Sequence, residues 1–109
     1  MSTASTASVT TDRPSRYAKQ LVSHMSRKAQ GTWDDEAGNG TITFTNADLT
    51  LAAADGALLL ALQADPEHLE LMEDVVGRHL VRFGTRDELV VEWVREGGAA
   101  GTVQRKSEH

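Results

Sequence analysis

The chain has 109 residues, enough for one domain with a single modest core. Its formal net charge of −5 at pH 7 argues against a nucleic-acid partner, because such proteins use Lys and Arg to bind phosphates. The absence of cysteine excludes disulfides, thiolate metal sites and thiol nucleophiles. No apolar run approaches the roughly 20 residues that span a bilayer, so no membrane partner is expected. The N-terminus has no apolar signal segment, and we therefore expect a cytoplasmic location.

The first third of the chain predicts one helix and little else. Residues 1–7 are mostly Ser, Thr and Ala, which is typical of a disordered lead. Residues 8–11 favour only a short edge strand, since Val9 is the one apolar residue among them. Pro14 fits the start of a helix that we expect to run to about Lys28. Its predicted apolar side consists of Ala18, Leu21, Val22, Met25 and Ala29.

The middle of the chain predicts an antiparallel meander whose registers follow from its turns. The pair Asp55-Gly56 is a strong two-residue hairpin signal, and Thr45-Asn46 and Gly38-Asn39 are the preceding loops. These loops bring apolar residues onto one continuous face, which a slip of one residue would break. The predicted pairs are Ala53 with Leu58, Leu51 with Leu60, Leu49 with Leu62, Ile42 with Leu49, and Trp33 with Phe44.

The last third predicts a long helix over Asp65–Phe83 and a strand over 88–94. Asp65 suits the N-cap and Pro66 the first helical position. Residues 96–109 are Gly-rich and polar and predict a flexible C-terminal tail, which leaves 8–95 as the single domain. The apolar stripe of the helix consists of Leu69, Met72, Val76, Leu80 and Phe83.

The predicted order is strand, helix, four strands, helix, strand. One apolar sheet face and two amphipathic helices predict an α+β two-layer sandwich, with an antiparallel sheet of 4–6 strands and both helices on one face. The other face carries mostly small and polar residues, so it is either solvated or a surface for a partner.

An acidic run and the absence of a nucleophile motif argue against a metal or an active site. Neighbouring residues of a strand point to opposite faces, so Asp34, Asp35 and Glu36 cannot converge on one ion, and we expect a solvated charge run. The chain has no Gly-x-Ser-x-Gly elbow and no phosphate loop. We therefore expect no catalytic residues, no metal and no cofactor, and the sequence favours a protein that is not an enzyme.

Two histidines border the apolar faces of the two helices. His24 lies one turn from Gln20 and one turn before Lys28, and His79 lies close to Arg82. If both helices cover the same sheet face, these borders meet in a groove that suits a small anionic molecule. The alternative is that each histidine is a half-buried border residue bonded to its neighbours. The predicted ligand-binding residues are Tyr17, Gln20, His24, Lys28, His79 and Arg82.

Three segments resemble the bacterial DUF2218 family of small uncharacterised proteins. They are TDRPSRYAKQLVSHMSRKA, the hairpin ending in ADGALLLALQA, and EDVVGRHLVRFGTRDELVVEW. The resemblance covers roughly residues 9–94. By position the family signature falls on Arg16, Tyr17, Lys19, Gln20, Leu21, His24, His79, Leu80, Arg82, Phe83 and Trp93.

The resemblance implies a physiological context for the protein but no established activity. Members are sometimes associated with siderophore-interacting flavin reductases, and the element order is similar to TATA-binding-protein-like sheets, an analogy of fold alone. We therefore expect a small-molecule-binding or accessory domain linked to iron-siderophore utilisation, with a small anionic ligand or a siderophore-related protein as its partner. The alternatives are an interaction module, which forms a homodimer or docks on a partner enzyme, and an unrecognised enzyme.

Overall fold

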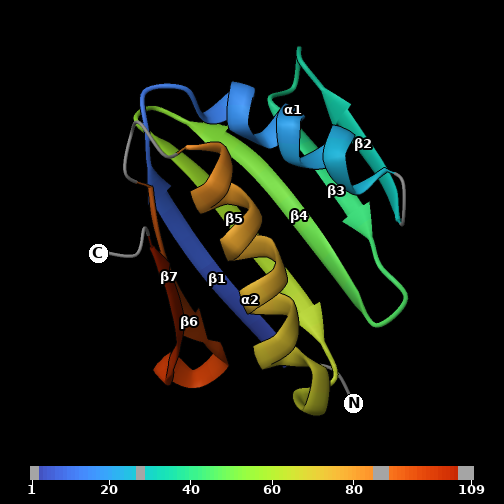
Figure 1. Cartoon of the computed structure of the whole chain (residues 1–109), viewed down its shortest axis with the longest axis vertical. Coiled ribbons are helices and arrows are strands. Elements are labelled where there is room, and N and C mark those ends of the chain that lie inside the picture. The colour runs from blue at the N-terminus through green and yellow to red at the C-terminus, as the bar shows by residue number, and fades with distance from the viewer. Residues whose placement is uncertain (1–2, 27–28, 85–88, 106–109) are drawn as a thin grey trace.

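Two helices cover one face of a seven-stranded antiparallel sheet in the computed structural model, which describes residues 3–26, 29–84 and 89–105 (Figure 1). The predicted α+β class is confirmed, with more strands than expected. The strand order across the sheet is β2-β3-β4-β5-β1-β6-β7. The helices are α1 (Pro14–Met25) and α2 (Pro66–Phe83), and the strands are β1 (Thr3–Thr10), β2 (Gln30–Asp34), β3 (Asn39–Thr43), β4 (Ala47–Ala54), β5 (Ala57–Ala64), β6 (Val90–Arg95) and β7 (Ala100–Arg105).

The second and third hairpins have the predicted registers. Gly56 takes a φ of 73° in the turn between β4 and β5, a backbone conformation that glycine adopts without steric cost. Leu51 pairs with Leu60, and Ile42 pairs with Leu49 across the preceding hairpin. All four side chains are buried. Turn chemistry and the apolar pattern therefore agree on this part of the sheet.

The predicted pairing of Trp33 with Phe44 is wrong, because Trp33 pairs with Gly40. The Asp34 side chain accepts hydrogen bonds from the backbone N–H groups of residues 36 and 37 at 3.0 and 3.2 Å, which places the turn earlier than a Gly38-Asn39 loop would. A Cβ on Gly40 would lie 2.8 Å from the Trp33 ring, so the observed register needs a glycine opposite the indole. Asp35 is exposed, as are its acidic neighbours.

The prediction of a disordered lead over 1–7 is wrong from Thr3 onward, and residues 1–2 lie outside the described part. The predicted strand over 8–11 is confirmed at residues 8–10, but it is longer than expected and lies inside the sheet rather than at an edge. Residues Thr3–Thr10 form β1, which pairs along its whole length with β5 and also with β6. Its inward residues Ser5, Ala7 and Val9 are buried. These side chains are small and carry little apolar signal, so pairing on both sides rather than local propensity makes this segment a strand.

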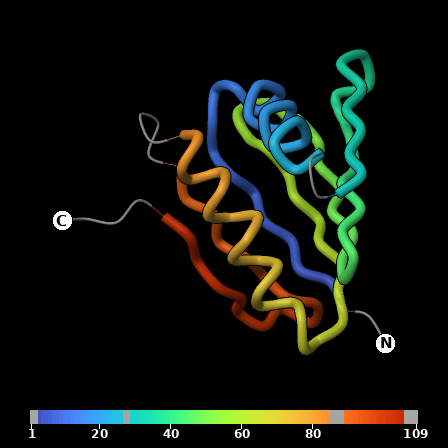
Figure 2. Tube along the Cα trace, turned by 45° about the vertical axis from the view of Figure 1, so that its right-hand side comes forward, coloured from blue at the N-terminus to red at the C-terminus, as the bar shows by residue number. Residues whose placement is uncertain are grey.

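The prediction of a flexible tail over 96–109 is wrong for residues 100–105, and residues 106–109 lie outside the described part. A short 3-10 turn at Glu96–Gly98 reverses the chain, with φ near 88° at Gly97 and Gly98. The following strand β7 pairs with β6 and lies beside α2 (Figure 2). The domain thus extends beyond the predicted 8–95 at both ends.

Both helices turn their apolar sides toward the sheet and bury one core between the two layers. The opposite face of the sheet has no helix over it in the described residues (Figures 1 and 2). Within the same residues, no helix has both the length and the hydrophobicity of a membrane span. A site on the helix side is therefore built from helices and strands, whereas a site on the bare face is built from strands alone.

We expect alanine substitutions at two neighbouring leucines of β5 to differ strongly in their effect on the free energy of unfolding. Leu60 is 2% exposed and Leu59, on the bare face, is 42% exposed. Leu60→Ala should lower the free energy of unfolding by about 2–5 kcal/mol, and Leu59→Ala by less than about 1 kcal/mol. Urea melts of the two variants measure this difference. Equal losses would contradict the assignment of the two faces.

The C-terminal hairpin predicts that truncation is harmful. A chain that ends at Arg95 loses β7. With it go one of the three residues that donate to a buried carboxylate on α2 and the hydrogen-bond acceptor of a buried indole on β6. We expect it to lose cooperative unfolding in thermal melts followed by circular dichroism. A chain that ends at Arg105 is the control and should melt like the full chain. A cooperative melt of the shorter chain near the full-length temperature would show that β7 is dispensable.

Candidate functional site

A pocket of about 580 Å³ lies between the two helices and the connection from β3 to β4. Its walls are mainly apolar, with two imidazoles and two neutral polar side chains among them. The volume falls in the range of roughly 300–1,000 Å³ that is usual for small-molecule sites. The lining residues are His24, Met25, Phe44, Thr45, Asn46, Met72, Val75 and His79.

The structure brings together the two histidines that border the helices. The ring centroids of His24 and His79 are 4.9 Å apart, and their planes are tilted by 46°. Phe83, at the end of α2, contacts both rings, with centroid distances of 5.4 Å to His24 and 6.4 Å to His79. The three rings form a cluster where α1 meets α2. His24 is exposed and His79 is half-buried, so both can be reached from solvent.

A backbone hydrogen bond fixes the orientation of His79. Its Nδ1 lies 2.6 Å from the carbonyl oxygen of Val75, one turn earlier in α2. A carbonyl only accepts, so Nδ1 carries the proton and donates it. When the ring is neutral, Nε2 therefore holds the lone pair and acts as an acceptor, and when the ring is charged, Nε2 is a donor. His79 therefore offers one nitrogen, Nε2, in a fixed orientation.

The other predicted site residues do not line this pocket. Tyr17 is buried and packs beside Gly84, just beyond the end of α2. Gln20 and Arg82 are exposed and lie outside the lining, and Lys28 lies outside the described residues. Among the described residues, the pocket wall contains no Lys or Arg. Of the predicted site residues that the structure describes, His24 and His79 line the pocket and the others do not.

The β3–β4 connection supplies a wall that the sequence analysis did not assign to the site. Phe44, Thr45 and Asn46 face the pocket, and the turn is closed by a 2.8 Å hydrogen bond from the N–H of Phe44 to the carbonyl of Ala47. Thr45-Asn46 was recognisable as a hairpin loop. Its position against the helices depends on how α1 crosses the sheet, which local patterns do not encode.

A buried carboxylate occupies the other side of α2. The Glu73 side chain is fully buried, and three residues donate to its oxygens. Arg95 donates to both oxygens, at 2.9 and 3.2 Å, and Ser5 donates at 2.6 Å. Thr102 donates through its N–H at 3.1 Å and its hydroxyl at 2.9 Å. These donors come from β1, β6 and β7, so one carboxylate ties the helix to three strands.

The network continues to the buried indole of β6. Gln104 donates to the Thr102 hydroxyl at 2.8 Å and accepts from Nε1 of Trp93 at 2.8 Å. Burial alone raises the pKa of Glu73, but the hydrogen bonds from Arg95, Ser5 and Thr102 outweigh it and hold that pKa below its ordinary value. Glu73 is therefore a charged, satisfied structural group. Its sequence signal was a carboxylate between Met72 and Val76 on an apolar stripe.

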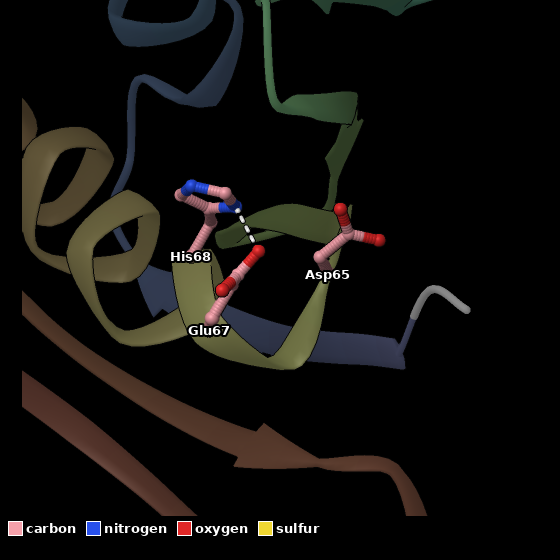
Figure 3. Close-up of side chains that lie close together, drawn as sticks. All are labelled: Asp65, Glu67 and His68. Carbon is pink, nitrogen blue, oxygen red and sulfur yellow. Dashed lines mark ion pairs between the residues drawn. The ribbon is translucent and has the colours of Figure 1, made fainter.

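Three potential metal ligands gather at the start of α2 (Figure 3). Glu67 Oε1 lies 3.9 Å from His68 Nδ1, and both Glu67 and Asp65 are exposed. In Figure 3 the carboxylate of Glu67 faces the imidazole, whereas that of Asp65 points away from it. Acidic side chains at a helix N-terminus stabilise the helix dipole without any ion, and we assign no metal to this cluster.

The fold and the pocket define a small two-layer α+β protein with an open sheet face and a site between its helices. The chain belongs to the DUF2218 family, described as an uncharacterized protein conserved in bacteria, whose profile matches residues 6–94. It is similar in fold to the NMR structure of PA4090 from Pseudomonas aeruginosa. The TM-score is 0.64 at 24% identity, over 89% of this chain and 98% of that one. No curated protein matches the chain.

The Glu73 network predicts acid sensitivity. Because the pKa of Glu73 is lower in the folded state, its ionised form stabilises the fold. This contribution is present above the ordinary pKa of 4.5 and is lost as pH falls through the folded-state pKa. Glu73→Gln should cost about 3 kcal/mol near neutral pH, because Arg95 loses its charged partner. This cost should shrink below about pH 4.5.

Urea melts of the wild type and Glu73→Gln between pH 7 and pH 3 measure this cost. Glu36→Gln, an exposed change in the turn between β2 and β3, is the control and should differ little from the wild type throughout. A cost for Glu73→Gln that is the same at pH 7 and pH 3 would contradict the assignment of Glu73 as the charged partner of Arg95.

Proposed function

We propose that this protein binds a small, weakly acidic organic molecule in the pocket between α1 and α2. The observation that carries the proposal is the pair of imidazoles 4.9 Å apart in the wall of a 580 Å³ pocket. Two titratable rings beside an apolar wall offer hydrogen bonds at one end of a ligand and apolar contact at the other.

The pocket wall indicates the chemistry of the ligand. Met25, Phe44, Met72 and Val75 favour an aromatic or otherwise apolar body. Charged imidazoles form charge-assisted hydrogen bonds with an anionic group, roughly twice as strong as neutral ones. Since the described lining has no Lys or Arg, recognition of the anion depends on His24 and His79. A catechol-type acid combines a flat apolar body with such a group.

A binding role is favoured over catalysis. The described lining contains no carboxylate, serine or cysteine, which leaves the Thr45 hydroxyl as its one potential side-chain nucleophile besides the imidazoles. We propose an accessory role in iron-siderophore utilisation in the cytoplasm, without a cofactor of its own. The family resemblance alone supports this physiological context, whereas the pocket supports the ligand class.

The proposal predicts binding that depends on both histidines. The probe is 2,3-dihydroxybenzoate, with neutral cyclohexanol as a ligand that lacks the anionic group. Calorimetric titration should show binding of the acid that weakens as salt rises, because salt screens the attraction between the anionic group and the imidazoles. His24→Ala and His79→Ala should each weaken binding by about tenfold or more, the cost of one charge-assisted hydrogen bond.

His68→Ala is the matched control, because His68 lies on the same helix and outside the pocket lining. It should bind the probe like the wild type. Thermal melts of His24→Ala and His79→Ala should stay close to that of the wild type. Equal affinity in all three variants would rule out the pocket, and a loss of stability without any measurable binding would make the histidines structural.

A further inference from the structure

The bare face of the sheet carries most of the exposed large apolar side chains of the described residues. Four of the five exposed large hydrophobic residues in the described chain point outward from this face. They are Leu59 on β5, Val90 and Val94 on β6, and Val103 on β7, at 38–53% exposure. Antiparallel sheets with one wet face place polar residues there, so this pattern indicates a covered surface.

Charge is scarce on the same face. On the described strands β4, β5, β1, β6 and β7, the outward residues include only three charged ones, although 25% of the chain is charged. Asp48 lies near one end of the face, Arg105 lies near the other, and Glu92 alone is central. A chain of net charge −5 therefore keeps nearly all its charge off this surface. Two copies could meet here with little repulsion.

The face also has a hollow, and the valine side chains of β6 and β7 form a ridge beside it. A shallow depression of about 550 Å³ lies over β4, β5, β1 and β6, where small residues such as Thr6, Ser8, Ala52 and Ala61 form its floor. The valines of β6 and β7 stand along one side of it. In the sheet, Thr6 of β1 pairs with Ala61 on one side and with Val94 on the other.

We propose that this face is the interface of a symmetric homodimer, with the two-fold axis running along β1. Such an axis exchanges the neighbours of β1, so Val94 of each copy faces Ala61 of the other and the ridge enters the hollow. Face-to-face packing of sheets is a standard way to bury such side chains.

The available area suits this assembly. The molecule measures 34 × 34 × 25 Å, and the sheet spreads across its two long dimensions (Figure 1). That leaves room for the roughly 800 Å² per partner of a stable interface. The pocket between α1 and α2 lies on the helix side of the sheet, so the proposed dimer neither depends on ligand binding there nor blocks it.

The experiment is sedimentation velocity of the full chain from about 1 to 200 μM, with thermal melts as the measure of folding. The wild type should sediment as two chains at the upper concentrations. Val94→Glu and Ala61→Lys should each weaken the dimer by about tenfold or more, since each places a charge in the interface of both subunits. Both positions are exposed in the single chain, so the melts should show cooperative folding. Leu71→Glu, on the outer side of α2 at 58% exposure, is the control and should stay dimeric.

A mixing experiment tests the proposed axis itself. Equal amounts of Val94→Glu and Ala61→Lys should form a mixed dimer, because the two substituted positions then face each other with opposite charges. Recovery of a two-chain species on mixing supports the axis along β1. A monomeric wild type at 200 μM would overturn the proposal, as would a dimer that Val94→Glu leaves intact or two folded variants that stay monomeric together.

Discussion

Glu73 is the group on which the arrangement of α2 and the sheet depends. A carboxylate removed from water costs several kcal/mol unless its oxygens are satisfied, and this one lies on the helix side that faces the core. Its donors stand on three strands, at Ser5, Arg95 and Thr102. The helix can reach this burial only when β1 is paired and the C-terminal hairpin has closed. The network therefore couples the two ends of the chain to the longest helix.

The same constraint positions the candidate pocket. Once Glu73 is held by β7 on one side of α2, the opposite border of the helix faces α1, and this border carries Val75 and His79. His24 meets it from the end of α1, at 4.9 Å between ring centroids. A rotation of α2 about its axis would break the hydrogen bonds to the Glu73 carboxylate and would also move the two imidazoles apart. The structural network and the pocket are thus two consequences of one helix orientation.

Sequence reasoning succeeded where local chemistry and apolar pattern pointed to the same register. Asp55-Gly56 and the alternating leucines determine two hairpins, because a slip would turn every leucine outward. It failed at Trp33, where the Asp34 side chain selects a different turn. It also missed Thr45 and Asn46 as pocket residues, since the crossing of helix and sheet is a property of the whole core. The meeting of the two histidines was predicted on the condition that both helices cover one sheet face, whereas the apolar wall around them was not predicted.

Strand β1 has little apolar pattern in its sequence, yet its small side chains affect both faces of the sheet. Its residues are Ser, Thr and Ala with one Val, so it has no period that predicts burial. On the inner face, the small Ser5 lets the Glu73 carboxylate approach to 2.6 Å, which a larger side chain would prevent. On the outer face, Thr6 and Ser8 leave the hollow that larger residues would fill. The small side chains of β1 give the strand little apolar pattern, and the same small side chains leave room on both faces of the sheet, for the carboxylate on one side and for the hollow on the other.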